Sequence, residues 1–204
     1  GRVDEAIKEA KEALKINSNS LAVYNNLGLA YMDRGELDMA KFVYQKAIQN
    51  IDGANNNAYI RTNLGWINYL KGDKGKAVFH LQEAVRLDPE LVPALMYLSH
   101  MYLDDRNFPD MVPLLETATR KDPDNYGAVM NLGIAYRGGG RYDDSRKMYE
   151  KALTLQPGNP DPWFNLALLH GDYVKLNDPT LKAYDDAIQA YGEYIKAGGK
   201  DAEL

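Results

Sequence analysis

The sequence predicts an all-α fold built from repeated pairs of antiparallel helices. The first observation is an internal repeat. Leucine recurs in steps of 37, 34, 34 and 34 residues at Leu27, Leu64, Leu98, Leu132 and Leu166. Such a period is typical of arrays of helical units. The second observation is the spacing within each unit. Apolar and small residues there are three and four residues apart, which is the helical period.

Turn signals divide each unit into two helices. They lie at Arg34-Gly35, Lys71-Gly72-Asp73, Asp105-Arg106-Asn107 and Gly138-Gly139-Gly140. Asp88-Pro89 and Asp122-Pro123 end units, because the residue before a proline leaves the helical region. Small residues recur where two helices must approach closely, and large residues recur where the gap must be filled. Gly28 and Gly133 are examples of the small residues, and Tyr44 and Tyr149 are examples of the large ones.

This pattern resembles the tetratricopeptide repeat (TPR) family, whose signature places Leu-Gly, Tyr, Ala, an aromatic residue, Ala and Pro at these spacings. The first full unit has Leu27-Gly28, Tyr31, Ala40, Tyr44 and Ala47 in these places. The pattern recurs five times in phase over nearly the whole chain. The resemblance implies a right-handed superhelical solenoid of antiparallel helix pairs, with about five and a half repeats. It also implies a concave groove that binds peptides or proteins.

The repeats divide the chain into one array with irregular ends. We expect a half repeat, consisting of a second helix only, at 1–20, and full repeats at 21–57, 58–91, 92–125 and 126–159. Residues 160–204 form a modified terminal repeat with an insertion at Gly171 to Thr180, where Asn177-Asp178-Pro179 predicts a turn. Three extra residues lie in 53–57. Pro113 predicts a late start or a kink in the helix after Phe108.

The two ends are candidate surfaces for self-association. A second helix without its partner exposes an apolar stripe that includes Ile7, Ala10 and Leu14, and natural arrays cap such faces. Either the chain is a fragment cut from a longer array, or this face pairs with another copy. At the other end, Tyr191 and Tyr194 belong either to a modified cap or to a docking surface.

On the TPR resemblance, the first helix of each unit lines the groove, and asparagine precedes the repeat leucine in four of five units. These residues are Asn26, Asn63, Asn131 and Asn165, with Tyr97 in the remaining unit. An asparagine amide both donates and accepts hydrogen bonds, so such a ladder can hold an extended peptide backbone. This arrangement is similar to the asparagine ladders of armadillo import receptors. The alternative is that each asparagine bonds within its own scaffold.

Aromatic and methionine side chains are expected around this ladder. They bury much area and adapt in shape, and the candidates are Tyr59, Trp66, Met96, Tyr97, His100, Met130 and Phe164, with Arg137 as a charged neighbour. Arg61 stands where the family often has tryptophan, so we expect it to reach an acidic group or solvent. The basic residues of the TPR subtype that clamps a C-terminal carboxylate are missing.

Composition narrows the function classes. The 24 Lys and Arg residues against 29 Asp and Glu residues give a net charge of −5, which disfavours a nucleic-acid partner. There is no cysteine, and the three histidines lack the spacing of zinc ligands. We therefore expect no enzyme, no cofactor and no metal. No apolar run approaches the length of a membrane span, so we expect a soluble cytoplasmic or periplasmic protein.

The sequence as a whole predicts an adaptor that binds a peptide or protein partner in the groove. The alternative hypothesis is a structural scaffold that self-assembles through its terminal helices as a homo-oligomer. The texture of the sequence is similar to bacterial TPR proteins of envelope, pilus, gliding-motility and magnetosome systems.

Overall fold

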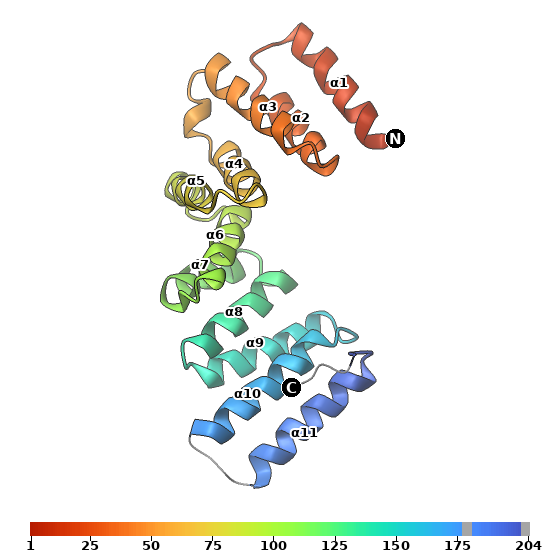
Figure 1. The fold of residues 1–204 in the computed structure, drawn as a ribbon, viewed down its shortest axis with the longest axis vertical. Coiled ribbons are helices and arrows are strands. Elements are labelled where there is room, and N and C mark those ends of the chain that lie inside the picture. Colours follow the sequence, from red (N-terminus) through yellow and green to blue (C-terminus); the bar gives the residue numbers. More distant parts are fainter. Residues whose placement is uncertain (177–180, 201–204) are drawn as a thin grey trace. The chain divides into compact units, whose positions relative to one another are not determined.

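A computed structural model describes residues 1–176 and 181–200, and this part of the chain is all-helical (Figure 1). It consists of one short 3-10 helix, η1 (Ala54–Asn56), and α-helices that run in chain order as α1 (Arg2–Ile16), α2 (Leu21–Asp33), α3 (Leu37–Asn50), α4 (Ala58–Leu70), α5 (Lys74–Leu87), α6 (Val92–Asp104), α7 (Phe108–Lys121), α8 (Tyr126–Gly138), α9 (Tyr142–Leu155), α10 (Asp161–Leu176) and α11 (Leu181–Lys196).

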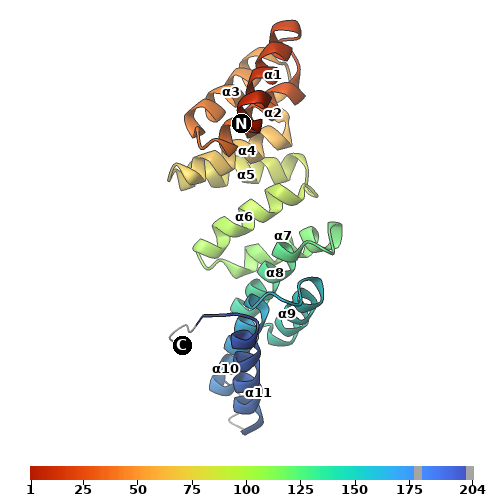
Figure 2. The same cartoon turned by 90° about the vertical axis from the view of Figure 1, so that its right-hand side faces the viewer.

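The helices form two compact units, one of residues 1–101 and one of residues 102–204, with the boundary inside α6. In the first unit, α1 packs on α2, α2 on α3, α3 on α4 and α4 on α5. In the second unit, α7 packs on α8, α8 on α9, α9 on α10 and α10 on α11. Figure 2 shows the same helices from a second direction. Each unit therefore consists of helices that pack mainly on their neighbours in the sequence, which is the pattern of a repeat array.

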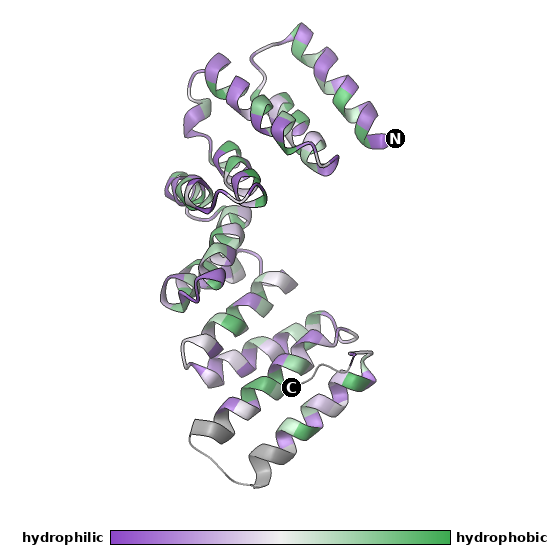
Figure 3. Ribbon diagram, in the orientation of Figure 1, coloured by the Kyte–Doolittle hydropathy of each residue, from purple (hydrophilic) through white to green (hydrophobic). Residues whose placement is uncertain are grey.

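Local sequence explains where several helices begin. Asn57 precedes α4 and its Oδ1 accepts a hydrogen bond from the backbone N of Ile60 at 3.1 Å. Asn125 does the same for Ala128 in α8 at 3.0 Å. Such N-caps satisfy backbone groups that the first helical turn leaves without a partner. Hydrophilic and hydrophobic residues are mixed along the coloured helices in Figure 3.

The core of the first unit depends on a glycine that faces a tyrosine. A Cβ atom on Gly28 would lie 2.3 Å from the ring of Tyr44, so only glycine allows α2 and α3 to pack with that ring between them. Tyr44 is completely buried. Gly133 and Tyr149 repeat the arrangement in the second unit, where the corresponding distance is 2.5 Å. The predicted pairing of small and large residues is confirmed at both places.

The turn inside a repeat needs a left-handed backbone. Gly35, Gly72 and Gly140 have φ angles of 79°, 79° and 76° at this point. The turn between α6 and α7 uses Arg106 instead, with φ of 53°. A non-glycine residue there is strained by about 1 kcal/mol.

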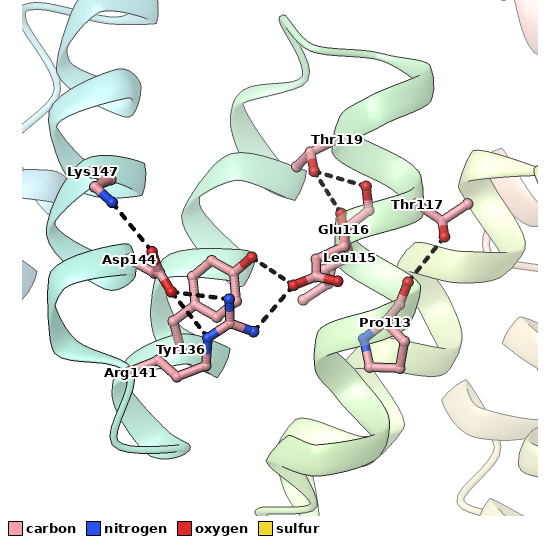
Figure 4. A network of polar contacts seen from close by, with 9 residues as sticks. All are labelled: Pro113, Leu115, Glu116, Thr117, Thr119, Tyr136, Arg141, Asp144 and Lys147. Carbon is pink, nitrogen blue, oxygen red and sulfur yellow. Dashed lines mark hydrogen bonds and ion pairs between the residues drawn. The ribbon is translucent and has the colours of Figure 1, made fainter.

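A polar network joins three helices of the second unit (Figure 4). The Tyr136 hydroxyl on α8 donates to Glu116 Oε1 on α7 at 2.7 Å, and Arg141 Nη1 reaches the same oxygen at 3.1 Å. The Arg141 guanidinium also lies over the Tyr136 ring and pairs with Asp144 on α9 at 2.9 Å. Burial and the Glu116 carboxylate raise the pKa of Tyr136 to about 12. Its hydroxyl therefore stays a donor at neutral pH.

Two segments were expected to be irregular, namely the helix after Phe108 and the insertion after Gly171. The expectation was a late start or a kink in the helix after Phe108. The late start is wrong, because α7 begins at Phe108 and contains Pro113, and the kink stays a prediction. Part of the insertion after Gly171 continues α10, which has 16 residues where α8 has 13. The predicted turn at Asn177-Asp178-Pro179 lies outside the described residues.

Candidate partner-binding site

Four aromatic side chains gather on the first helices of the first unit. Trp66 and Tyr69 belong to α4, and Tyr97 and His100 to α6. Trp66 stacks on Tyr97 with ring centroids 4.4 Å apart and an interplanar angle of 8°, and on Tyr69 at 5.1 Å and 24°. We call these four residues the aromatic cluster, and the side of α2, α4 and α6 that carries it the first-helix face.

The helical period positions these rings. Each pair is three residues apart on its helix, so both members lie on one face. The Tyr69 hydroxyl and His100 Nε2 are 3.1 Å apart, a hydrogen bond that links α4 to α6. Burial raises the pKa of Tyr97. The cluster is therefore a fixed, mostly apolar surface rather than a set of independent side chains.

A pocket of about 310 Å³ lies near the start of α4 in the same unit. Its walls come from the beginnings of α2 and α4 and are made by Leu21, Ala22, Asn25, Asn57 and Tyr59. The Tyr59 side chain is 55% exposed. Tyr59 was predicted from the sequence, whereas the pocket was not, because its walls come from two different helices.

The inserted loop is held by Arg61. Its Nε donates to the backbone O of Asn55 and its Nη2 to Asn55 Oδ1, both at 2.8 Å. The guanidinium also contacts His80 Nδ1 at 3.2 Å. The expectation named an acidic group or solvent, whereas the hydrogen bonds of Arg61 go to Asn55 and His80; its charge also helps to lower the pKa of Glu83. Arg61 holds the inserted loop through its two hydrogen bonds to Asn55. The sequence signal for this role was that the insertion and the unusual arginine occur close together.

The predicted asparagine ladder divides into two kinds of residue. Asn63 Nδ2 donates to Asn25 Oδ1 and to the Tyr44 hydroxyl, both at 2.9 Å. Asn165 Nδ2 donates to the backbone O of Asp161 at 2.9 Å. These two amides bond within the scaffold, which was the alternative interpretation.

Asn26 and Asn131 are different. Asn26 is exposed and Asn131 is half-buried. Neither side chain has a hydrogen bond to the part of the chain that the structure describes. Both amides therefore keep their full hydrogen-bonding capacity for another molecule.

The other predicted residues are placed unevenly. Met96 is half-buried, whereas Met130 is only 7% exposed and packs in the core of the second unit. The expectation that Met130 offers a contact surface is corrected by this burial, since it lies against Tyr149 and its neighbours. The ring of Phe164 packs against Tyr194 with centroids 5.4 Å apart.

The second unit has its own pocket, of about 420 Å³. Arg137 Nε donates to Asp172 Oδ2 at 2.7 Å on its rim, and the pocket is lined by Leu103, Arg106, Phe108, Ile134, Arg137, Gly138 and Asp172. Sequence reasoning selected Arg137 but missed Phe108 and Gly138. A Cβ on Gly138 would lie 2.4 Å from the Phe108 ring, so the glycine run at 138–140 was the signal.

The predicted self-association residues are mostly covered. Ile7 is 4% exposed, and Ala10 and Leu14 pack against the same core. The expected exposed stripe is corrected by the packing of α1 on α2. Tyr194 donates to the backbone O of Lys200 at 2.7 Å and contacts Tyr191.

Two structural findings concern metal binding and membrane insertion. In residues 1–176 and 181–200, no group of three or more His, Asp or Glu side chains is arranged to hold a metal ion. Over the same residues, no helix has the length and apolarity to cross a membrane.

Family models match most of the chain. A tetratricopeptide repeat model matches residues 19–90, a second one matches residues 98–160, and a TPR repeat model matches residues 1–35. The chain belongs to the tetratricopeptide repeat family. Its fold is the TPR fold of consecutive antiparallel helix pairs.

Similar proteins include one curated relative and several solved structures. The BBSome complex member BBS4 of Bos taurus is 32% identical over 103 residues, which are 50% of this chain and 19% of that protein. The chain thus spans about a fifth of the length of this relative.

The structural neighbours share the fold. YrrB, described as a TPR protein with an unusual peptide-binding site, is 19% identical and has a TM-score of 0.74, with 92% of this chain and 95% of YrrB covered. A structure of MamA from Desulfovibrio magneticus RS-1 is 18% identical with a TM-score of 0.73, covering 86% of this chain and 93% of its own. A further MamA structure is 27% identical, with a TM-score of 0.62 over 76% of this chain and 89% of its own.

Membership of the family defines the general function. TPR proteins are in general protein-interaction modules, and membership of the family supports a protein-interaction role for this chain.

Proposed function

We propose that the chain is an adaptor that holds a peptide or protein partner against its first helices. The aromatic cluster carries this proposal. Large rings in a fixed arrangement give much contact area at little entropic cost, which is why aromatic residues dominate binding hot spots. Exposed Tyr59 and Leu29 extend the same face. YrrB, which shares the fold, is described as having a peptide-binding site.

Asparagine side chains supply the polar contacts in this proposal. Asn26 and Asn131 have amides that bond to nothing in the described scaffold, so they suit the backbone of a partner. Asn63 and Asn165 are left out of this contact, because both amides bond within the scaffold. Arg137 contributes only as part of its pair with Asp172.

Affinity capture from the source organism tests whether the first-helix face binds a partner. The chain and its Tyr97→Ala variant are compared with Phe42→Ala, which removes a ring that is 51% exposed on α3, a second helix. We expect one partner, identified by mass spectrometry, to be retained by the wild type and Phe42→Ala and lost with Tyr97→Ala. Equal retention by all three proteins would mean that the partner binds elsewhere.

The asparagine contribution is tested with that partner and the double variant Asn26→Ala, Asn131→Ala. We expect affinity to fall about tenfold or more, because two hydrogen bonds to the partner are lost. The matched control is Asn165→Ala, whose amide donates within its own helix. Unchanged affinity in the double variant would remove the asparagine ladder from the mechanism.

Self-assembly as a structural scaffold is the second candidate function. The observation that favours it is on α11, where Ile188 is 70% exposed and Ile195, seven residues later on the same face, is 40% exposed. Light scattering over a concentration series tests it. A mass that stays that of one chain at the highest concentration would exclude it, whereas growth that Ile188→Lys abolishes would support it.

A further inference from the structure

The pocket at the start of α4 offers hydrogen-bond donors but no charge. All five residues that line it are uncharged. Asn57 Oδ1 is occupied as the N-cap acceptor for Ile60, and Asn25 Oδ1 accepts from Asn63 Nδ2. These bonds fix both amides, and their Nδ2 groups make no hydrogen bond within the described part of the chain. A ligand that brings acceptors can therefore bond to both Nδ2 groups.

The surface beside the pocket is aromatic. Tyr59 and Trp66 are seven residues apart on α4, so they share a face and lie about 10.5 Å apart along the helix axis. Tyr97 stacks on Trp66 at 4.4 Å, which continues the aromatic surface to α6. The ligand therefore needs apolar groups of ring size at intervals of about 10 Å.

A polyproline II helix meets both requirements. Proline has a backbone carbonyl but no N–H, so a proline-rich segment offers acceptors and few donors. The polyproline II helix has three residues per turn and a rise of about 3.1 Å, so the rings at i and i+3 lie on one side about 9 Å apart. Its backbone has no internal hydrogen bonds, and aromatic-lined surfaces recognise it for that reason.

We infer that the first-helix face of the first unit binds an uncharged, proline-rich segment in the polyproline II conformation. One proline ring lies against Tyr59 at the pocket, and the ring three residues away lies against Trp66 and Tyr97. The Nδ2 groups of Asn25 and Asn57 donate to the carbonyls of the segment near the pocket. This inference rests on the proposed binding at this face and adds the chemistry of the partner.

The test uses tryptophan fluorescence and a defined peptide. The chain has two tryptophans, so Trp163→Phe leaves Trp66 as the only reporter, and circular dichroism confirms that this protein is folded. Blocked decaproline is titrated, with a blocked Ser-Gly peptide and an alanine-rich helical peptide of the same length as controls. We expect a saturable change in Trp66 emission with decaproline and none with the Ser-Gly peptide.

Two variants with matched controls test the named contacts. Tyr59→Ala removes a contact ring, and Phe42→Ala removes a similarly exposed ring from a second helix. Asn57→Asp keeps the cap acceptor but removes the Nδ2 donor, while Asn56→Asp adds the same charge one residue away. We expect Tyr59→Ala and Asn57→Asp to weaken decaproline binding about tenfold or more and both controls to leave it unchanged.

The outcomes separate this inference from the proposed function. Absence of saturable decaproline binding, or equal binding of the Ser-Gly peptide, overturns the inference. Equal losses in Asn57→Asp and Asn56→Asp also overturn it, because charge and not the donor would then be responsible. If the helical peptide binds in place of decaproline and Tyr97→Ala abolishes that binding, the first-helix face remains a binding site and only the polyproline chemistry fails.

Discussion

Tyr44 and Tyr149 occupy the same position in two repeats, one in each unit, and differ in one respect. Both rings are fully buried and both face a glycine. The Tyr44 hydroxyl accepts from Asn63 Nδ2 at 2.9 Å and donates to the backbone O of Asn25 at 3.3 Å. The Tyr149 hydroxyl is buried and has no hydrogen-bond partner among the described residues.

Neighbouring residues explain the difference. In the first unit, Asn25 Oδ1 accepts from Asn63 Nδ2 and so holds that amide beside the Tyr44 hydroxyl. In the second unit, the residue that corresponds to Asn25 is Met130, which has no side-chain acceptor, and Asn165, which corresponds to Asn63, bonds to Asp161 of its own helix. Burial raises the pKa of Tyr149, and nearby Ser145 and Arg137 oppose that shift without completing a hydrogen bond to the hydroxyl. The same tyrosine therefore stabilises one unit more than the other.

The feature that both units share, a glycine facing a buried tyrosine ring, gives the largest expected effect on stability. Gly28→Ala and Gly133→Ala each place a Cβ within 2.6 Å of a tyrosine ring. We expect each variant to lower the free energy of unfolding by about 2 kcal/mol, because overpacking outweighs the higher helix propensity of alanine. Thermal or urea unfolding measures this.

Gly75→Ala is the control for both variants. Gly75 lies within α5, and a Cβ there meets no atom within 4 Å. This variant should gain about 0.5 to 1 kcal/mol from helix propensity. A loss in Gly75→Ala as large as in Gly28→Ala would contradict the role assigned to the tyrosine rings.

Removing the hydroxyl should have opposite effects in the two units. Tyr44→Phe breaks two hydrogen bonds and should lower the free energy of unfolding by about 1 to 2 kcal/mol. Tyr149→Phe removes a buried polar group without a partner and should raise it by about 1 kcal/mol. Urea unfolding measures both, and effects of the same sign would show that the two hydroxyls are equivalent in solution.

The histidines sharpen the comparison through pH. Burial lowers the pKa of both His80 and His170. The charges that act on His80 are Arg61, Lys41 and Lys76, which lower its pKa further. His170 has Asp186 and Glu150, which raise its pKa, together with Arg146, which lowers it. The first unit should therefore be the more sensitive to acid.

The sign follows from proton binding. A histidine whose folded pKa lies below its ordinary value of about 6.5 is protonated first in the unfolded chain, so stability is present above that pH and falls as the pH drops below it. We expect His80→Gln to reduce the loss of melting temperature between pH 7 and pH 5 more than His170→Gln does. Melting curves at both values measure this, and a larger effect of His170→Gln would contradict the assignment.

The candidate contact residues were predicted from the sequence together with the TPR resemblance, and their role in binding stays a prediction. Trp66, Tyr97 and His100 were selected from the positions that the TPR resemblance assigns to the groove. The helical period places Tyr97 and His100 on one face of α6, whereas the stacking of Trp66 on Tyr97 depends on the approach of α4 and α6. Predictions that depend on a neighbouring helix were less accurate. Met130 was expected on a surface and is buried, and Ile7 was expected to be exposed and is covered by packing of α1 on α2.

The sequence by itself determined the helices through the three- and four-residue spacing within each of them. It also determined their pairing and the glycine-to-large-residue contacts between paired helices, because these recur at fixed places in a repeat of about 34 residues. Only the tertiary structure decided which asparagines bond within the scaffold, that Arg61 fastens the inserted loop, and that a donor-lined pocket forms beside Tyr59. The physical reason is that a hydrogen bond needs its partner within about 3 Å. That distance is set by how different helices approach one another, and the spacing of residues along the chain does not contain it.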